Sequence, residues 1–289
     1  MIIVRLIGGL GNQMFQYAAG RSLAHHHNTD LFLDLTWFAS FTLRKYELDS
    51  FRINAKIASP DQLKHVSRSR KDAVCLGIRH IFFGETVFQY VNELTFDSHE
   101  KAVYLPDNVY LDGYWQSEKF FTEIPDIMKN ELLINTLPSP INQELLNEIN
   151  GCDSVSLHIR RGDYVSNPKT MELHGVLGIE YYMQALNLIR ETVNDPHIFV
   201  FSDDIPWVRE NLKTNLPLYF IDHNGADKGY EDLRLMSNCK HHIIANSSFS
   251  WWGAWLNKNP NKIVIAPNKW FNELKKDTRD LIPESWYKI

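Results

Sequence analysis

The stretch Val155–Tyr164, with the sequence VSLHIRRGDY, decides how the rest of the chain is interpreted. Its first half, Val155–Ile159, is short, apolar and β-branched, which predicts a buried strand. Arg160 and Arg161 follow directly, and Gly162 permits a sharp turn after them. In open α/β sheets, ligands lie beyond the carboxyl ends of the strands. The stretch therefore predicts a sheet strand that carries a ligand site at its end.

Two neighbouring guanidinium groups favour a phosphate ligand, because each planar fork can bind two phosphate oxygens at once. For an isolated Arg-Arg pair, an ordinary surface salt bridge is the alternative. Other predicted strands of the chain also end in residues suited to binding a nucleotide. They favour the phosphate site over the salt bridge.

The composition bounds the class of protein. The 289 residues are 44% hydrophobic and 22% charged, as in a soluble globular protein of about two domains. A net charge of −5 argues against nucleic acid as the main partner, so an anion site must be local. The cysteines, Cys75, Cys152 and Cys239, are scattered, which excludes a disulfide framework and fits a reducing compartment.

Neither a secretory signal nor an apolar run of roughly 18 residues is present in the sequence. We therefore expect a cytoplasmic protein without a transmembrane segment. Peripheral association with the inner face of a membrane stays open, as does the oligomeric state.

The N-terminus shows a strand, a turn and a helix in succession. Ile2–Leu6 predicts the strand, Gly8–Gln13 the turn, and Met14–Ala24 an amphipathic helix, as at the start of a doubly wound α/β domain. The Gly-Leu-Gly in the turn lacks the third glycine of the dinucleotide fingerprint. We expect instead a loop whose backbone and whose Asn12 and Gln13 amides face a cleft between domains. Glycines that serve only a tight turn are the alternative.

The segment from residue 40 to 120 is aromatic, and its composition indicates no function. Tyr110–Ser117 predicts a strand that ends in a turn. Its Tyr114 and Trp115 either stack on a sugar ring or pack inside the protein. The basic run Ser67–Lys71 either contacts an anionic ligand or is a solvated face, which is the commoner case. His25–His27 is expected to be a solvated helix end rather than a metal site, because consecutive side chains do not share one helix face.

Pro138-Ser139-Pro140 is the clearest break in the chain. A helix is expected at Gln143–Ile149, before the strand that begins at Val155. We place the domain boundary within residues 138–152, which gives domains of residues 1–150 and 151–289.

Two further predicted strands of the second half also end in polar residues. Ile198–Phe201 leads into Asp203 and Asp204, one of which is expected to cap the next helix and the other to be free. A free carboxylate there can bind the Watson–Crick edge of guanine or hold a ribose; capping alone is the alternative. His242–Ala245 leads into Asn246–Ser250 at the start of another helix. Such a start supplies backbone N–H groups and the positive end of the helix dipole, which bind phosphate.

The tryptophans of that last helix are expected to pack into the core. One more strand, Lys262–Ala266, is expected to close the sheet.

Four segments resemble, in the same order, the motifs of bacterial and animal α-1,2-fucosyltransferases. They are Gly8–Tyr17, His158–Tyr164, Phe201–Asp204 and Asn246–Trp252. The resemblance implies an α/β protein of the GT-B class, with two Rossmann-like domains facing across a cleft. The N-terminal domain would hold the acceptor and the C-terminal domain GDP-fucose. The implied reaction is an inverting, metal-independent transfer of L-fucose to the 2-hydroxyl of a terminal galactose in a glycan.

The resemblance also implies roles for individual residues. Arg160 would contact the β-phosphate and stabilise the leaving group, where one well-placed donor contributes about 3 kcal/mol. Arg161 is expected to hold Asp163 or the loop, and Asn12 to orient a substrate. The expected donor-binding residues are His158, Arg160, Arg161, Asp203, Asp204, Asn246, Ser247, Ser248, Phe249 and Ser250. The general base is left among Asp163, Glu172 and His174, with Asp163 ranked first.

No cofactor or metal is expected. The sequence has no Asp-x-Asp, the spacing with which metal-dependent GT-A enzymes hold a diphosphate. Three alternatives are left: a GDP-fucose-dependent transferase acting on another hydroxyl, a nicotinamide-dependent oxidoreductase, and a non-catalytic protein that binds a sugar nucleotide. The failed dinucleotide fingerprint disfavours the oxidoreductase. The natural acceptor glycan is not encoded in any motif.

Overall fold

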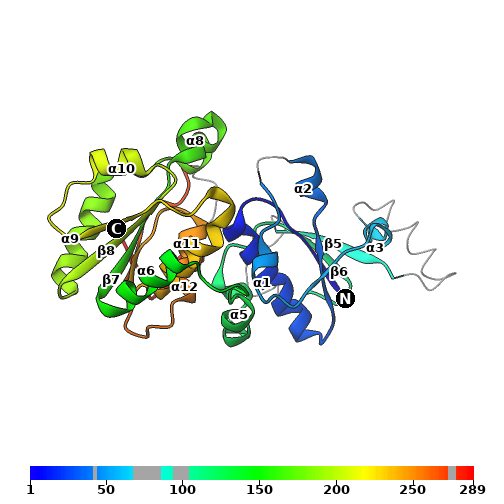
Figure 1. Ribbon diagram of the computed structural model, residues 1–289. Helices are drawn as coiled ribbons and strands as arrows, with labels where there is room; N and C mark the ends of the chain where they lie inside the picture. Colours follow the sequence, from blue (N-terminus) through cyan, green and yellow to red (C-terminus); the bar gives the residue numbers. More distant parts are fainter. Residues whose placement is uncertain (42–43, 68–85, 94–103, 273–277) are drawn as a thin grey trace. The chain divides into compact units, whose positions relative to one another are not determined.

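The computed structural model describes residues 1–41, 44–67, 86–93, 104–272 and 278–289, with Asp163 described in its backbone alone. The chain divides into two compact units, Met1–Asn135 and Thr136–Ile289. Each unit is built on a six-stranded parallel sheet with helices packed on it (Figure 1). The expected α/β class with two Rossmann-like halves is confirmed.

The division between the units lies earlier than the expected residue 150. Helix α6 (Pro140–Gly151) packs against α11 (Gly229–Asn238) and so belongs to the second unit. The proline-rich break at residues 138–140 is the start of this helix, where Ser139 caps the first turn by accepting a hydrogen bond from the Asn142 backbone.

The first unit places its first strand in the middle of the sheet. Across the sheet the strands are β3 (Lys56–Ile57), β2 (Leu31–Asp34), β1 (Ile2–Arg5), β6 (Val109–Asp112), β5 (Phe88–Asn92) and β4 (Val66–Ser67). The main helices are α1 (Leu10–His26), α2 (Thr36–Ser40), α3 (Pro60–Lys64) and α5 (Pro125–Glu131). Since β2 and β6 lie on opposite sides of β1, the carboxyl ends of β1 and β6 form the switch point of this sheet.

Helix α1 is longer than predicted and is buried around most of its circumference rather than along one face. A methyl group on Gly20 would lie 2.9 Å from a Leu31 methyl and 3.2 Å from Val4 Cβ, so the helix lies directly on β1 and β2. Its last turn carries His25 and His26, as expected of a helix end that favours positive charge. Among the described residues no cluster of metal-binding side chains is present.

The second unit has the same kind of sheet, with β7 in the middle. Across it the strands are β12 (Tyr287–Lys288), β11 (Val264–Ala266), β10 (His241–Ile243), β7 (Asp153–Ile159), β8 (Pro196–Ser202) and β9 (Leu218–Ile221). Besides α6 and α11, the helices are α7 (Gly162–Ser166), α8 (Pro168–His174), α9 (Ile179–Thr192), α10 (Ile205–Asn211) and α12 (Ser248–Leu256). The expectation that β11 closes the sheet is wrong, because the C-terminal residues add β12 in parallel to it.

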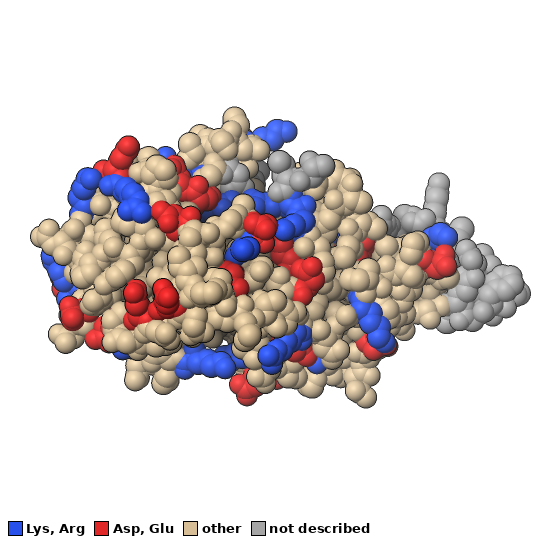
Figure 2. All heavy atoms as spheres, in the orientation of Figure 1, with Lys and Arg blue, Asp and Glu red and all other residues tan. Residues whose placement is uncertain are grey.

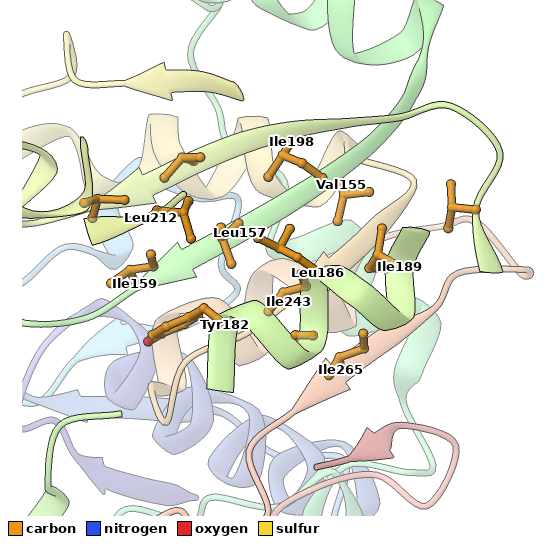
Figure 3. Close-up of a cluster of buried hydrophobic side chains, with 14 residues drawn as sticks. Val155, Leu157, Ile159, Tyr182, Leu186, Ile189, Ile198, Leu212, Ile243 and Ile265 are labelled. Atoms are coloured by element: carbon orange, nitrogen blue, oxygen red, sulfur yellow. The ribbon is translucent and has the colours of Figure 1, made fainter. Parts of the chain in front are cut away.

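The core of the second unit confirms the prediction that residues 155–159 form a buried strand. Val155, Leu157 and Ile159 project from one face of β7 towards α9 (Figure 3). Tyr182 and Leu186 of α9 point back at them, because helix residues four apart share a face. In α12, Trp251 and Trp252 are buried, as expected, whereas Trp255 is half-buried. Trp251 donates a hydrogen bond of 2.8 Å from its indole N–H to the Leu281 carbonyl.

The surface charge agrees with the expectation that any anion site is local. On the face drawn in Figure 2, acidic and basic side chains of the described residues are interspersed rather than gathered by sign. The net charge of the chain is −5. Attraction of an anion to this face must therefore depend on particular side chains.

Candidate functional site

The predicted donor motifs of the second unit come together at one edge of its sheet. Strand β7 pairs in parallel with β8 on one side and β10 on the other, so the three carboxyl ends are neighbours. Arg160–Gly162 follows β7, Asp203 and Asp204 follow β8, and Asn246–Ser250 follows β10. Because the chain continues from β7 to β8 and only later to β10, the crevice between β7 and β10 is the switch point.

Arg160 lies at this edge and is partly open to solvent. Its Nη1 is 2.7 Å from Asp203 Oδ2, and the two side chains keep 23% and 26% of their exposure. The guanidinium carbon lies 5.6 Å from the centre of the Tyr164 ring. Arg160 is thus held by a carboxylate that a phosphate can replace.

Asp203 is not the free carboxylate that the sequence suggested. Besides the pair with Arg160, its Oδ1 accepts a hydrogen bond of 2.8 Å from the Arg161 backbone N–H. A methyl group on Gly162 would lie 2.3 Å from Asp203 Oδ2, so only glycine leaves room for this contact. Asp203 therefore holds the turn after β7, and reading of the guanine or ribose by Asp203 stays a prediction.

Arg161 has the holding role that was expected, with a different partner. Its Nε donates to Asp204 Oδ2 at 3.1 Å, and its guanidinium lies 3.7 Å from the centre of the Trp207 ring. Asp204 in turn accepts from the Trp207 backbone N–H at 3.2 Å and caps α10, which confirms the predicted cap. The alternative partner, the Asp163 side chain, lies outside the described part of the chain.

His158 lies directly before Arg160 and is buried, with 6% of its surface exposed. Its ring centre is 5.7 Å from that of Phe249 at the start of α12. Burial, and secondarily the charge of Arg160, lowers the pKa of His158 to about 3, so the ring is neutral near pH 7. Its Nδ1 is buried and has no hydrogen-bond partner in the described structure. A neutral imidazole can offer a donor or an acceptor to a base or a ribose.

The start of α12 agrees in part with the prediction of a phosphate-binding helix end. Ser247 occupies the cap position of this nine-residue helix, but its side chain accepts no capping hydrogen bond from the described residues. Ser248 and Phe249 are half-buried at the start of the first turn. The start of this helix carries the positive end of the helix dipole, which favours an anion.

Two other residues of this segment have structural contacts instead. Asn246 is buried and donates from Nδ2 to the carbonyls of His174 and Trp270, at 2.9 and 3.2 Å. The hydroxyl of Ser250 is buried as well and donates to the Ser247 carbonyl at 3.3 Å. Their side-chain donors are thus occupied, and a role for them towards the donor stays a prediction.

The general base is not decided by the described contacts. Glu172 is exposed on α8. His174 ends the same helix, with its ring stacked at 4.8 Å on Tyr164 and 5.1 Å from Phe271. The Asp163 side chain lies outside the described part. Asp163, Glu172 and His174 therefore remain predictions for this role.

In the first unit, Gln13 does not have the expected orientation towards a cleft. It is fully buried and donates from Nε2 to the Gly8 and Lys45 carbonyls, at 3.0 and 2.9 Å. Its Oε1 accepts from the Glu47 backbone at 3.0 Å, so Gln13 joins the segment 44–47 to the glycine turn. The sequence contains a signal for this burial, the helical spacing of four residues that are all buried: Gln13, Gln16, Tyr17 and Gly20.

Asn12 is half-buried at the start of α1, and its Oδ1 accepts from Gln116 Nε2 at 2.8 Å. Orientation of a substrate by Asn12 stays a prediction.

The buried neutral histidines predict a loss of stability in acid. Burial lowers the pKa of His242 well below its ordinary value as well; this ring lies 2.8 Å from Ser156 Oγ and 2.9 Å from Asn257 Nδ2. Below pH ~6.5 the unfolded chain binds protons at His158 and His242 that the folded chain does not, so stability falls as pH falls. For each of the two histidines, we expect the free energy of unfolding to fall by up to about 1.4 kcal/mol per pH unit below pH ~6.5.

Urea unfolding at pH 7.5, 6.5 and 5.5 measures this slope. Asp232, whose pKa burial raises to about 6, changes stability in the opposite direction, so the histidines are isolated by comparing variants. His242→Gln and His158→Gln are each expected to flatten the acid slope. An unchanged slope in both buried variants would contradict the pKa assignment.

Two units, each built on a parallel six-stranded sheet, agree with the expected GT-B fold. Residues 1–289 match the sequence family described as Glycosyl transferase family 11, and the chain belongs to this family. It is 35% identical over 308 residues to the α-1,2-colitosyltransferase of Escherichia coli, covering 100% of this chain and 99% of that protein. It is similarly 35% identical to the O-antigen biosynthesis glycosyltransferase WbnK of Escherichia coli, covering 98% of this chain and 99% of that protein.

A more distant relative is galactoside α-(1,2)-fucosyltransferase 1 of Bos taurus, 26% identical and covering 96% of this chain and 73% of that protein. Among solved structures, a mutant of Arabidopsis thaliana FUT1 in complex with GDP has a TM-score of 0.53 at 13% identity, covering 91% of this chain and 69% of that one. POFUT1 in complex with GDP has a TM-score of 0.50 at 15% identity, covering 92% and 98%. These structures support the GT-B fold.

In the described part of the chain, no helix combines the length and the apolar character needed to span a bilayer. Cys152 and Cys239 are free thiols, and Cys75 lies outside the described residues.

Proposed function

We propose that this glycosyltransferase transfers L-fucose from GDP-fucose to the 2-hydroxyl of a terminal galactose in a glycan, with inversion and without a metal. The observation that carries the proposal is the position of Arg160, which lies at a sheet switch point next to strand ends that also carry His158 and the start of α12. The motif resemblance and the galactoside α-(1,2)-fucosyltransferase relatives supply the sugar and the linkage.

The leaving group sets the main chemical requirement. In a single displacement the fucose carbon becomes cationic while negative charge collects on GDP. In this proposal Arg160 and the start of α12 receive that charge, and one such donor is worth about 3 kcal/mol in transfer reactions. They take the place of the divalent ion that other glycosyltransferases use.

Binding of the donor involves an exchange of partners at Arg160. The guanidinium of Arg160 pairs with Asp203 at 2.7 Å. A diphosphate offers more charge and more acceptor oxygens than one carboxylate, so it competes well for the same fork. Asp203 keeps its bond to the Arg161 backbone, and the turn stays in place.

The acceptor hydroxyl must lose its proton as the new bond forms. Asp163 is the first of the three candidates for this base, and Asn12 orients the acceptor or the donor sugar from the first unit.

A colitose donor is the second candidate. It is favoured by the 35% identity to an α-1,2-colitosyltransferase over the whole chain. Colitose is L-fucose without its 3-hydroxyl, so both donors present the same GDP to Arg160 and differ only at the sugar.

The test supplies GDP-fucose and GDP-colitose separately in EDTA, with and without lactose, and measures GDP release and the linkage of the product by NMR. We expect lactose-dependent release that survives EDTA and an α-1,2 linkage to galactose. Release of GDP from GDP-colitose but not from GDP-fucose would identify colitose as the transferred sugar. Tight GDP binding without release, with lactose or any of a panel of β-galactosides, would contradict galactose as the acceptor.

A further inference from the structure

The switch point of the first sheet carries a second group of polar and aromatic residues with no role so far. They are the last residues of β1, β5 and β6, Arg5, Asn92 and Asp112, together with Tyr90 and the segment Gly113–Trp115 that follows β6. Strands β5, β6 and β1 are consecutive and parallel across the sheet, so their carboxyl ends lie at one edge of it.

Three of these residues form a connected triad. Arg5 Nη1 donates to both carboxylate oxygens of Asp112, at 3.2 and 3.1 Å, and the Tyr90 hydroxyl donates to Asp112 Oδ2 at 2.5 Å. The Arg5 side chain remains 35% exposed and that of Asp112 14%. Asn92 extends the triad by donating to the Tyr90 hydroxyl at 3.4 Å. Planar donors and acceptors fixed in this way suit the adjacent hydroxyls of a sugar.

Tyr114 supplies an aromatic face beside the triad. It is 43% exposed, whereas its neighbour Trp115 is buried, so the structure separates the two aromatics that the sequence could not distinguish. Tyr114 follows Asp112, the last residue of β6, by two positions. Burial, and after it the charges of Glu93 and Asp112, raises the pKa of the Tyr114 hydroxyl, and Arg5 lowers it. An exposed aromatic ring beside fixed polar groups is the usual composition of a sugar site.

The segment that presents Tyr114 is rigidly held. Glu93 accepts hydrogen bonds from the backbone of Tyr114 and of Trp115, at 2.6 and 2.9 Å. Trp115 has a φ of +55°, a strained value for a bulky residue, and a methyl group on Gly113 would lie 2.4 Å from Glu93 Cβ. Strain that the surrounding contacts maintain is typical of binding sites.

We infer that Tyr114 and the triad Arg5–Asp112–Tyr90 form a subsite for a neutral hexopyranose, with the ring of Tyr114 stacked on the sugar and the triad bound to its hydroxyls. The subsite rests on the proposed function, because it assigns the acceptor side of the same reaction. Its charge selects a neutral sugar: Arg5 carries one positive charge and Asp112 and Glu93 carry two negative ones. A uronic acid would be repelled.

The chain contains a matched control for the triad. Tyr17, Glu131 and Arg21 form the same tyrosine–carboxylate–arginine arrangement, with Arg21 Nη2 3.0 Å from Glu131 Oε1. This second triad joins α1 to α5, away from the strand ends, and its arginine is only 14% exposed. Tyr17→Phe therefore removes the same hydroxyl as Tyr90→Phe without touching the subsite.

The experiment measures the binding of GDP and of three neutral sugars to each full-length variant. GDP affinity is measured by calorimetry. The affinities for methyl β-D-galactopyranoside, the matching glucoside and the N-acetylgalactosaminide are measured by saturation-transfer NMR. Wild type is expected to bind at least one of these sugars and to reject methyl galactopyranosiduronate. Tyr114→Ala should weaken sugar binding roughly tenfold or more. Tyr114→Phe keeps the aromatic ring and should bind the sugar as tightly as wild type. Tyr90→Phe should weaken sugar binding, whereas Tyr17→Phe should leave it unchanged. GDP affinity should be unchanged in all of them.

Sugar binding by Tyr114→Ala and Tyr90→Phe at the wild-type level overturns the subsite, and so does a wild type that binds GDP but none of the three neutral sugars. Equal binding of the uronate overturns the choice of a neutral sugar. Failure of wild type to bind GDP contradicts the proposed function instead, whatever the sugars do, so the two proposals fail separately.

Discussion

Arg160→Ala is expected to lower the rate of sugar transfer by about a hundredfold to a thousandfold, the effect of removing one donor that stabilises a developing anion. The guanidinium lies at the switch point of the second sheet and pairs with the Asp203 carboxylate at 2.7 Å. Arg160→Lys keeps the charge but loses the planar fork, so an intermediate rate is expected. Steady-state release of GDP from the donor, at saturating acceptor, measures both variants.

Arg209 provides the control for this prediction. It is also an arginine of the second unit that pairs with an aspartate, Asp222 at 3.2 Å, and covers an aromatic ring, Phe220 at 4.0 Å. It is about half exposed and lies on α10 rather than at a strand end. Arg209→Ala should therefore transfer sugar at the wild-type rate. If Arg160→Ala and Arg209→Ala lowered the transfer rate equally, Arg160 would affect the reaction only through the stability of the folded protein.

Gly162→Ala is expected to have the second largest effect, a loss of activity of about tenfold or more with little change in unfolding temperature. The new methyl group would lie 2.3 Å from Asp203 Oδ2, and the carboxylate must rotate away. Rotation breaks its pair with Arg160 and its hydrogen bond to the Arg161 backbone. The turn that positions Arg160 is then no longer fixed, so both the affinity for GDP and the transfer rate should fall.

Gly151→Ala controls for the loss of a glycine, because a methyl group there meets no atom within 4 Å. Asp203→Ala in the Gly162→Ala background tests the cause. If the conflict is with the carboxylate, the second change removes a contact already lost, and the two losses are not additive. Full additivity would show that the methyl group acts elsewhere.

Much of the fold is predictable because it follows from local apolar patterns. Residues 198–201 are a continuous apolar run, residues 155–159 carry apolar side chains at every second position, and both stretches form central strands. Strands β3, β4 and β12 have two residues each, too few for any periodic signal, and pairing with a neighbouring strand alone makes them strands. The position of the domain boundary was not predictable for a similar reason. It depends on the packing of α6 against α11, a tertiary contact between segments far apart in the sequence.

The candidate site was predictable as a set of strand ends but not as a set of contacts. Asp204 could be identified as a cap from the Ile-Pro that follows it. Nothing in the sequence shows that Asp203 is bonded to a residue 42 positions earlier, because such pairing depends on the parallel register of β7 and β8. Asn246 and Gln13 show the same limit, since a buried amide that joins two loops has the same sequence signature as an amide that binds a ligand.

The most direct test is calorimetric titration of GDP and of GMP into wild type and Arg160→Ala in EDTA. The two nucleotides differ by the β-phosphate, which is the group assigned to Arg160. Wild type is expected to bind GDP at least about tenfold more tightly than GMP, a difference of about 1.4 kcal/mol, and Arg160→Ala to lose this preference. Equal binding of GDP and GMP by wild type, or an undiminished preference in the variant, would contradict the assignment of the diphosphate to Arg160.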